Sequence, residues 1–232
     1  MRVLAISHQR DAGPGVFADA VEAGGHRLDT WHVAELGDPP DDPLDYDGVM
    51  TFGGAMHPDQ EDAHAWLAPE KALLRDLLAR GTPLLGVCLG SQLLAEAAGG
   101  RAVRAREPEI GWFEVEVTET GSSDPVLGPL APRFEAFEWH SYTVELPQGA
   151  AILARTPVCV QGFRVGEAAW GIQFHAEVTA ADARRWIDDY DTDEDAVRIG
   201  VDPERLAAET EPRIAAFNQL GRDLCGRWLA AL

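Results

Sequence analysis

The chain has 232 residues, of which 46% are hydrophobic and 25% charged, the balance of a globular protein with a sizeable core. Its formal net charge of −20 argues against binding to nucleic acid or to an anionic membrane surface. Three widely separated cysteines argue against a disulfide framework or a metal cluster, and the absence of a long apolar run or a signal peptide predicts a cytoplasmic protein.

The first half of the chain alternates short apolar runs with amphipathic patterns. We expect strands at Arg2–Ser7, Arg27–Val33, Gly48–Phe52 and Pro83–Val87, helices at Val16–Ala23, Trp66–Ala79 and from Cys88 to Gly99-Gly100, and loops at Asp11–Gly15 and Gly37–Asp47. Strand alternating with helix predicts an α/β fold, with a doubly wound, mostly parallel sheet and helices on both faces.

After Gly100 the pattern changes to short extended runs, which we expect to add antiparallel strands to the sheet. These runs are Arg101–Ala105, Trp112–Thr118, Phe134–Glu138, Ala151–Arg155, Val158–Arg164 and Ala169–Phe174. A helix is expected at Ala180–Asp189, a solvated acidic turn at Asp188–Asp195, and one long helical pattern at Pro203–Leu232. We expect residues 190–232 to pack back on the core, so that residues 1–232 form a single domain.

Cys88 lies where a buried strand passes into a helix, with Gly86 two residues before it and Gly90 two residues after it. Small residues at these positions allow the sharp turn of a nucleophile elbow, here with Cys in place of Ser. The N–H groups and dipole at the helix N-terminus would favour a thiolate and could receive an oxyanion. The alternative for this stretch alone is a buried structural cysteine.

His175 follows a buried strand, and Glu177 comes two residues later. A histidine there could serve as the base for a cysteine brought near it, with the carboxylate holding the imidazole. Alone, such a histidine is more often structural, but together with the cysteine elbow it favours a Cys-His-Glu triad. Gly53 and Gly54 follow another strand and would suit an oxyanion hole, although a simple tight turn explains them equally well.

Together these motifs resemble class I (triad) glutamine amidotransferases, whose pattern is an early G-G loop, a G-x-C-x-G-x-Q elbow and a late F-H-P-E. Here the last two motifs are Gly86-Val-Cys88-Leu-Gly90-Ser-Gln92 and Phe174-His175-Ala176-Glu177. Within that family the chain is similar to stand-alone proteins resembling the amidotransferase domain of GMP synthase, through Glu109–Trp112 and Trp139–Tyr142. The resemblance implies the flavodoxin-like amidotransferase fold.

The resemblance also implies hydrolysis of the glutamine side-chain amide to glutamate and ammonia through a γ-glutamyl thioester on Cys88, with His175 moving the protons. The loop of Gly53 and Gly54 would supply the Gly54 N–H to the oxyanion, and the Leu89 N–H would be its second donor. Gln92 and the backbone at Ser141 and Tyr142 would hold the α-amino and α-carboxylate groups. The resemblance implies neither a metal nor a cofactor.

Ala176 stands where the family usually has proline, and we expect it to change backbone stiffness and leave the triad in place. His57, His64 and His140 are expected in loops or pocket walls, and Cys159 and Cys225 in the core.

No P-loop or ATP-pyrophosphatase pattern is evident, so ammonia would pass to a separate synthetase partner, whose docking we expect to complete the oxyanion hole by a peptide flip. The alternatives are a hydrolase of γ-glutamyl amines or peptides and a catalytically silent regulatory subunit. No oligomeric state is predicted.

Overall fold

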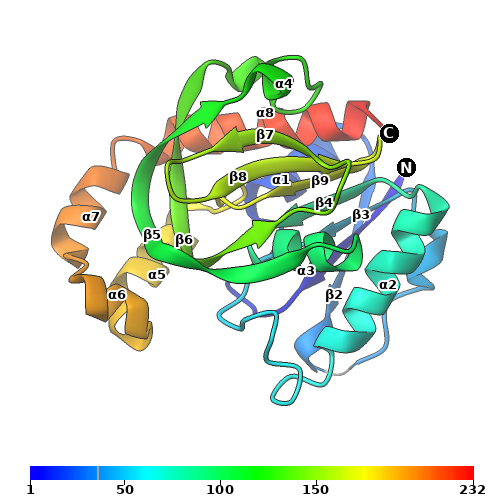
Figure 1. Ribbon diagram of the computed structural model, residues 1–232, viewed down its shortest axis with the longest axis horizontal. Helices are drawn as coiled ribbons and strands as arrows, with labels where there is room; N and C mark the ends of the chain where they lie inside the picture. The colour runs from blue at the N-terminus through cyan, green and yellow to red at the C-terminus, as the bar shows by residue number, and fades with distance from the viewer. Residues whose placement is uncertain (36) are drawn as a thin grey trace.

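The computed structural model describes residues 1–35 and 37–232, and the strands among them form one nine-stranded sheet (Figure 1). Its parallel part has the order β2-β1-β3-β4-β9, which is the order of a flavodoxin-like doubly wound sheet. These strands are β1 (Arg2–Ser7), β2 (Arg27–His32), β3 (Gly48–Thr51), β4 (Leu84–Val87) and β9 (Ala169–Ile172). The predicted α/β fold class is confirmed.

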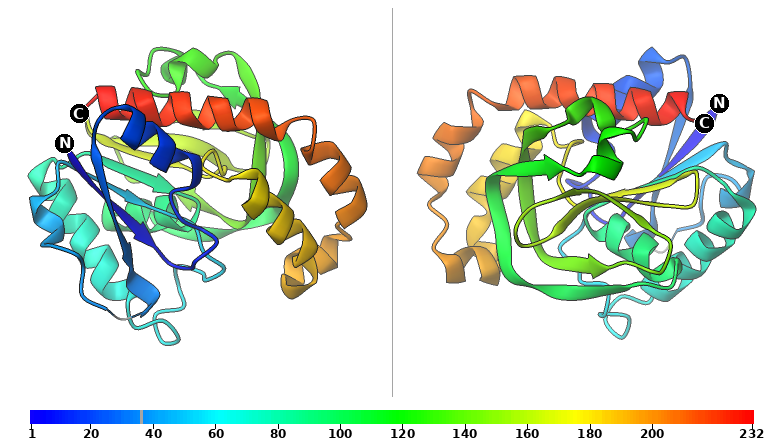
Figure 2. Two further views of the ribbon diagram at one scale, coloured as in Figure 1. Left: turned by 180° about the vertical axis from the view of Figure 1, so that it is seen from behind. Right: turned by 45° about the horizontal axis from the view of Figure 1, so that its top comes forward.

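Helices cover both faces of the parallel strands (Figures 1 and 2). One layer consists of α1 (Gly15–Ala23) and α8 (Ile214–Ala230), and the opposite layer of α2 (Leu67–Arg80) and α3 (Leu89–Ala97). Each layer closes its own apolar cluster: Phe17 and Trp228 are fully buried in the first, and Leu74 and Leu93 in the second. The central strands β3, β4 and β9 are buried on both sides, which explains their largely apolar sequences.

The antiparallel strands β5 (Arg101–Val117), β6 (Arg133–Glu145), β7 (Ala151–Arg155) and β8 (Val160–Val165) extend the sheet beyond β9. The prediction of two separate strands between Arg101 and Thr118 is wrong, because β5 continues through an irregularity in its pairing between Arg104 and Glu109. The predicted strand Phe134–Glu138 is only part of β6. Pairing on both sides of this irregularity holds the curved β5–β6 ribbon together (Figure 1).

The C-terminal pattern predicted as one helix forms two, α7 (Pro203–Thr210) and α8. Pro212 explains the break, since it has no N–H to donate and its ring would clash with the carbonyl four residues before it in a continuous helix. The helix expected from Ala180 is present as α5 (Ala180–Asp188), and Thr179 and Asp182 form a capping box at its start.

Gly221 and Gly226 form a matched pair for testing how closely α8 packs on the chain. A Cβ at Gly221 would lie 1.9 Å from Ala176 O, whereas a Cβ at Gly226 would meet nothing within 4 Å. We expect Gly226→Ala to raise the free energy of unfolding by about 0.5–1 kcal/mol, because alanine is the better helix former. Gly221→Ala should lower it by about 1–3 kcal/mol through overpacking. Urea unfolding measures both, and equal effects would contradict the contact.

Candidate active site

Cys88 occupies a sharp turn between β4 and α3. Its backbone has φ 51° and ψ −112°, a conformation that costs a non-glycine residue about 1–3 kcal/mol. The flanking glycines are required by close approach: a Cβ at Gly90 would lie 2.1 Å from Thr51 O, and a Cβ at Gly86 would lie 2.7 Å from Gly90 O. The Cys88 N–H donates to Ile172 O (2.9 Å), which ties the turn to β9.

His175 comes just after β9, and its N–H donates to Phe137 O (3.0 Å). Its ring Nδ1 lies 2.8 Å from Glu177 Oε1, and both side chains are buried. Trp186 of α5 meets the imidazole edge-on, with ring centroids 4.8 Å apart. Burial favours the neutral ring, but the Glu177 carboxylate and the Cys88 sulfur outweigh burial and raise the pKa of His175 well above 6.5.

The predicted catalytic and oxyanion residues meet at the carboxyl ends of adjacent strands. Gly53 follows β3, Cys88 follows β4 and His175 follows β9, and these three strands are neighbours in the sheet. A Cβ at Gly53 would lie 3.0 Å from His175 Cε1 and 3.6 Å from Cys88 Cβ. Ligands of open α/β sheets bind at this edge.

A cavity of about 800 Å³ opens over this point. Most of the predicted site residues line this cavity, namely Gly54, Cys88, Leu89, Gln92, Ser141, Tyr142 and His175. Glu177 lies behind His175, against the first residues of α1. Leu89 is the first residue of α3, where an N–H has no intrahelical acceptor. The predicted pieces of the site therefore face one space.

Gln92 extends from α3 toward β6. Its Nε2 lies 3.1 Å from Gln173 Oε1 and 3.5 Å from Tyr142 O. Ser141 and Tyr142 lie on β6 and line the cavity. These three residues line one side of the cavity, and the Tyr142 ring stacks on His57 of the loop after Gly54.

The acidic run Asp188–Asp195, predicted as a solvated turn, is mostly exposed, but it also contributes to the cavity rim. Its last two residues begin the short helix α6 (Glu194–Ile199), whose Asp195 is buried and binds Arg104 of β5 through both carboxylate oxygens (2.7 and 2.6 Å). The Trp139 indole N–H donates to Asp193 (2.9 Å), which also caps α6. Burial raises the pKa of Asp195, but Ser141, Arg198 and Arg104 outweigh burial and lower it to about 2. An aspartate such as Asp193, just before a helical pattern, is a typical helix N-cap and could have predicted the start of α6.

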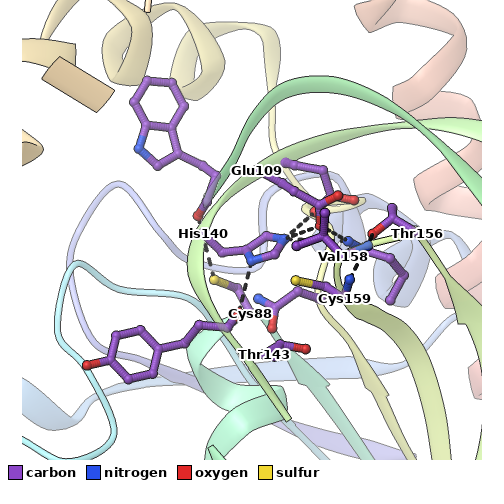
Figure 3. Close-up of polar contacts among 12 residues, drawn as sticks. Cys88, Glu109, His140, Thr143, Thr156, Val158 and Cys159 are labelled. Carbon is purple, nitrogen blue, oxygen red and sulfur yellow. Dashed lines mark hydrogen bonds and ion pairs between the residues drawn. The ribbon is translucent and has the colours of Figure 1, made fainter. Parts of the chain in front are cut away.

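A buried charged network lies beside Cys88 (Figure 3). His140 was expected in a loop or pocket wall; it lines the cavity, but from β6. Its Nε2 is 3.2 Å from Glu138 Oε2 and 3.4 Å from Glu109 Oε2, and its Nδ1 is 2.9 Å from Tyr142 O. Burial favours neutral imidazole, but hydrogen bonds to both glutamates raise the pKa of His140 to about 10.

Among the described residues, Glu109, His140 and Cys159 form the group whose donor atoms are close enough for a metal ion, within 4.8 Å of one another. The geometry of these three residues does not favour a bound metal ion. The two glutamates that raise the pKa of His140 favour its protonated ring, and an imidazolium has no lone pair to offer a metal ion. Burial and the Glu109 charge raise the pKa of Cys159 to about 12, which keeps it a thiol.

A family model described as glutamine amidotransferase class-I matches residues 19–189. Among solved structures, a glutamine amidotransferase from Thermotoga maritima aligns with a TM-score of 0.87 and 30% identity, over 99% of this chain and 98% of that one. In the described part of the chain, no helix has the length and apolar character to span a membrane.

Two further relatives differ in their named activity. One, a subunit of the glutamine-hydrolysing GMP synthase of Haloarcula marismortui, is 35% identical over 143 residues, 60% of this chain and 68% of that protein. A γ-glutamyl-L-1-hydroxyisopropylamide hydrolase of a Pseudomonas species is 31% identical over 146 residues, 59% of this chain. The alignment spans about half of that hydrolase (49%).

Proposed function

The chain belongs to the class-I glutamine amidotransferase family, and on that premise we propose that it hydrolyses the side-chain amide of glutamine to glutamate and ammonia. The observation that carries this proposal is the convergence of Cys88, the His175–Glu177 pair and the Gly53–Gly54 loop on one cavity. Residues 1–232 would act as a single, cytoplasmic domain.

In the first half of the reaction, the Cys88 thiolate attacks the amide carbon. The developing oxyanion accepts hydrogen bonds from the N–H groups of Gly54 and Leu89. His175, protonated and held by Glu177, gives its proton to the departing nitrogen, so that ammonia leaves and a γ-glutamyl thioester remains.

In the second half, a water molecule attacks the thioester carbon. Neutral His175 takes a proton from that water, glutamate leaves, and the thiolate of Cys88 and the imidazolium of His175 are regenerated. Gln92 and the backbone of Ser141 and Tyr142 would hold the α-amino and α-carboxylate groups, which aligns the side-chain amide with the thiol.

The ammonia would pass to a separate synthetase. The similarity to the Haloarcula GMP synthase chain, which is named as one subunit of that enzyme, supports this part of the proposal.

A second candidate is hydrolysis of γ-glutamyl conjugates, in which an amine leaves in place of ammonia. The cavity of about 800 Å³ favours it, since pockets of about 300–1,000 Å³ enclose ligands much larger than glutamine. The similarity to the Pseudomonas hydrolase points the same way. Both candidates use the same triad and oxyanion hole, so only the leaving group distinguishes them.

Product release by the purified chain tests both candidates. We expect ammonia from glutamine, and a glutamine-like diazo-ketone should label Cys88 while Cys159 stays free, because Cys159 is buried as a thiol. Rapid release of amine from a γ-glutamyl amide, with no ammonia from glutamine, would transfer the assignment to the second candidate. Release of neither product, with Cys88 unlabelled, would favour a catalytically silent regulatory protein.

A further inference from the structure

His8 follows β1 and is buried against Trp66, with the ring centroids 4.7 Å apart and the planes nearly parallel. Its Nε2 lies 2.8 Å from Glu70 Oε2, and its Nδ1 lies 3.1 Å from Gly53 O. A carboxylate and a carbonyl oxygen can only accept hydrogen bonds, so both ring nitrogens donate and His8 is an imidazolium. Burial opposes this charge, but Glu70 outweighs burial and raises the pKa of His8 above 6.5.

Glu70 itself is held from a second side. Its Oε1 accepts a hydrogen bond from Thr51 Oγ1 (2.6 Å), and the side chains of His8 and Glu70 have no exposed surface. Hydrogen bonds to ionised groups are the strong ones in a protein interior. A fully buried chain of such bonds therefore runs from Thr51 through Glu70 and His8 to the carbonyl of Gly53.

The sheet order determines what this chain does to the loop after β3. In that order β3 lies between β1, which leads to His8, and β4, which leads to Cys88. The Gly53 carbonyl is directed to the β1 side, and the peptide joining Gly53 to Gly54 is trans. The two ends of a trans peptide point in opposite directions. The N–H of Gly54 is accordingly directed to the β4 side.

We infer that His8 is a positioning residue that, anchored by Glu70, holds the Gly53–Gly54 peptide with its N–H toward Cys88, so that the oxyanion hole is complete in the isolated chain. The inference rests on the proposed function, because it assigns the N–H of Gly54 to the oxyanion of that reaction. Donors that are already aimed at the developing charge cost no reorganisation during the reaction. No partner is then needed to rotate this peptide.

A purely structural role is the competing explanation, in which His8 serves only to satisfy the buried Glu70. His8→Asn and His8→Gln separate the two roles. The Asn amide nitrogen falls near the place of Nδ1 and can reach Gly53 O, whereas the Gln amide nitrogen falls near Nε2 and can reach Glu70. Both variants remove the imidazole ring that stacks on Trp66, so the comparison between them controls for the loss of that stacking.

We expect His8→Gln to lower kcat about 10- to 100-fold, because a displaced oxyanion donor loses part of the 100- to 1,000-fold that one such donor supplies. His8→Asn should keep kcat nearer to that of the wild type. KM and the rate of Cys88 alkylation by iodoacetamide should stay unchanged in both, since neither reports on the oxyanion. The reverse order of kcat, with His8→Asn the poorer enzyme, would overturn the inference.

A measurement on the wild-type chain needs no variant to fold. A glutamate γ-semialdehyde should add to Cys88 as a hemithioacetal whose oxygen lies about 2.7–3.1 Å from Gly54 N, with Gly53 O still on His8. A crystal structure of the free chain and of the adduct reports this directly. Rotation of the peptide on adduct formation would overturn the inference, whereas a rigid peptide without turnover of any γ-glutamyl compound would overturn only the proposed function.

Discussion

Cys88→Ala is expected to lower kcat on the order of 10⁶-fold, the loss seen when a triad enzyme is deprived of its nucleophile. Without the sulfur no thioester forms, and His175 and the oxyanion donors have no attacking atom to assist. Steady-state ammonia or amine release measures the loss. Cys159→Ser is the matched control, because it removes another buried thiol and should leave turnover within a few-fold of the wild type. Substantial activity in Cys88→Ala would exclude the nucleophile.

Cys88→Gly separates the chemistry of the position from its backbone strain. It should be as inactive as Cys88→Ala but more stable than that variant by about 1–2 kcal/mol, because only glycine adopts a positive φ without a penalty. Urea unfolding of the two variants gives the difference. Equal stabilities would show that the turn at Cys88 stores no strain.

The parallel half of the sheet could be predicted because its signals are local. Each buried strand is a continuous apolar run of four to six residues, and each helix ends at a glycine or beside one, such as Gly81 after α2. Length separates these short runs from the longer amphipathic patterns of the helices, and their alternation leads to the doubly wound order.

The curved β5–β6 ribbon could not be predicted to its true length for the opposite reason. Residues 104–107 of β5 are mostly charged and exposed, so they carry little alternation. The residues on either side of this stretch, 101–104 and 109–116, pair with β6, and this pairing across the sequence joins the two flanks into one strand. Ser141 and Tyr142 reach the cavity because of this pairing.

The same distinction between local and long-range signals applies to the residues of the site. Cys88, His175 and Glu177 belong to short motifs and were predicted together, although their roles stay proposals. His8 pairs with a carboxylate 62 residues away, and Arg104 pairs with Asp195 91 residues away. The sequence around a single histidine after a strand does not predict which distant residue it will contact. Such supporting residues become visible only once the fold brings the segments together.

Replacing His175 is expected to cost nearly as much as replacing Cys88. His175→Gln should lower kcat on the order of 10⁶-fold, because both proton transfers pass through the imidazole, whereas Glu177→Gln should cost about 10⁴-fold, as for triads that lose only the orienting acid. The fold should survive both changes, which far-UV and near-UV circular dichroism would verify. Equal losses in the two variants would mean that Glu177 does more than orient and charge the ring.

The pH profile gives a second test of the same pair. The reacting form needs protonated His175, so activity should fall as pH rises through the pKa of that ring, which the Glu177 charge and the Cys88 sulfur hold well above 6.5 against the effect of burial. Glu177→Gln removes the carboxylate charge and leaves burial in place, so the ring loses its proton at lower pH. The alkaline limb of kcat/KM should therefore move to lower pH in this variant, while Glu209→Gln, an exposed change on α7, should leave it in place. An alkaline limb that stays fixed in Glu177→Gln would show that the ionisation controlling the rate belongs to a group other than His175.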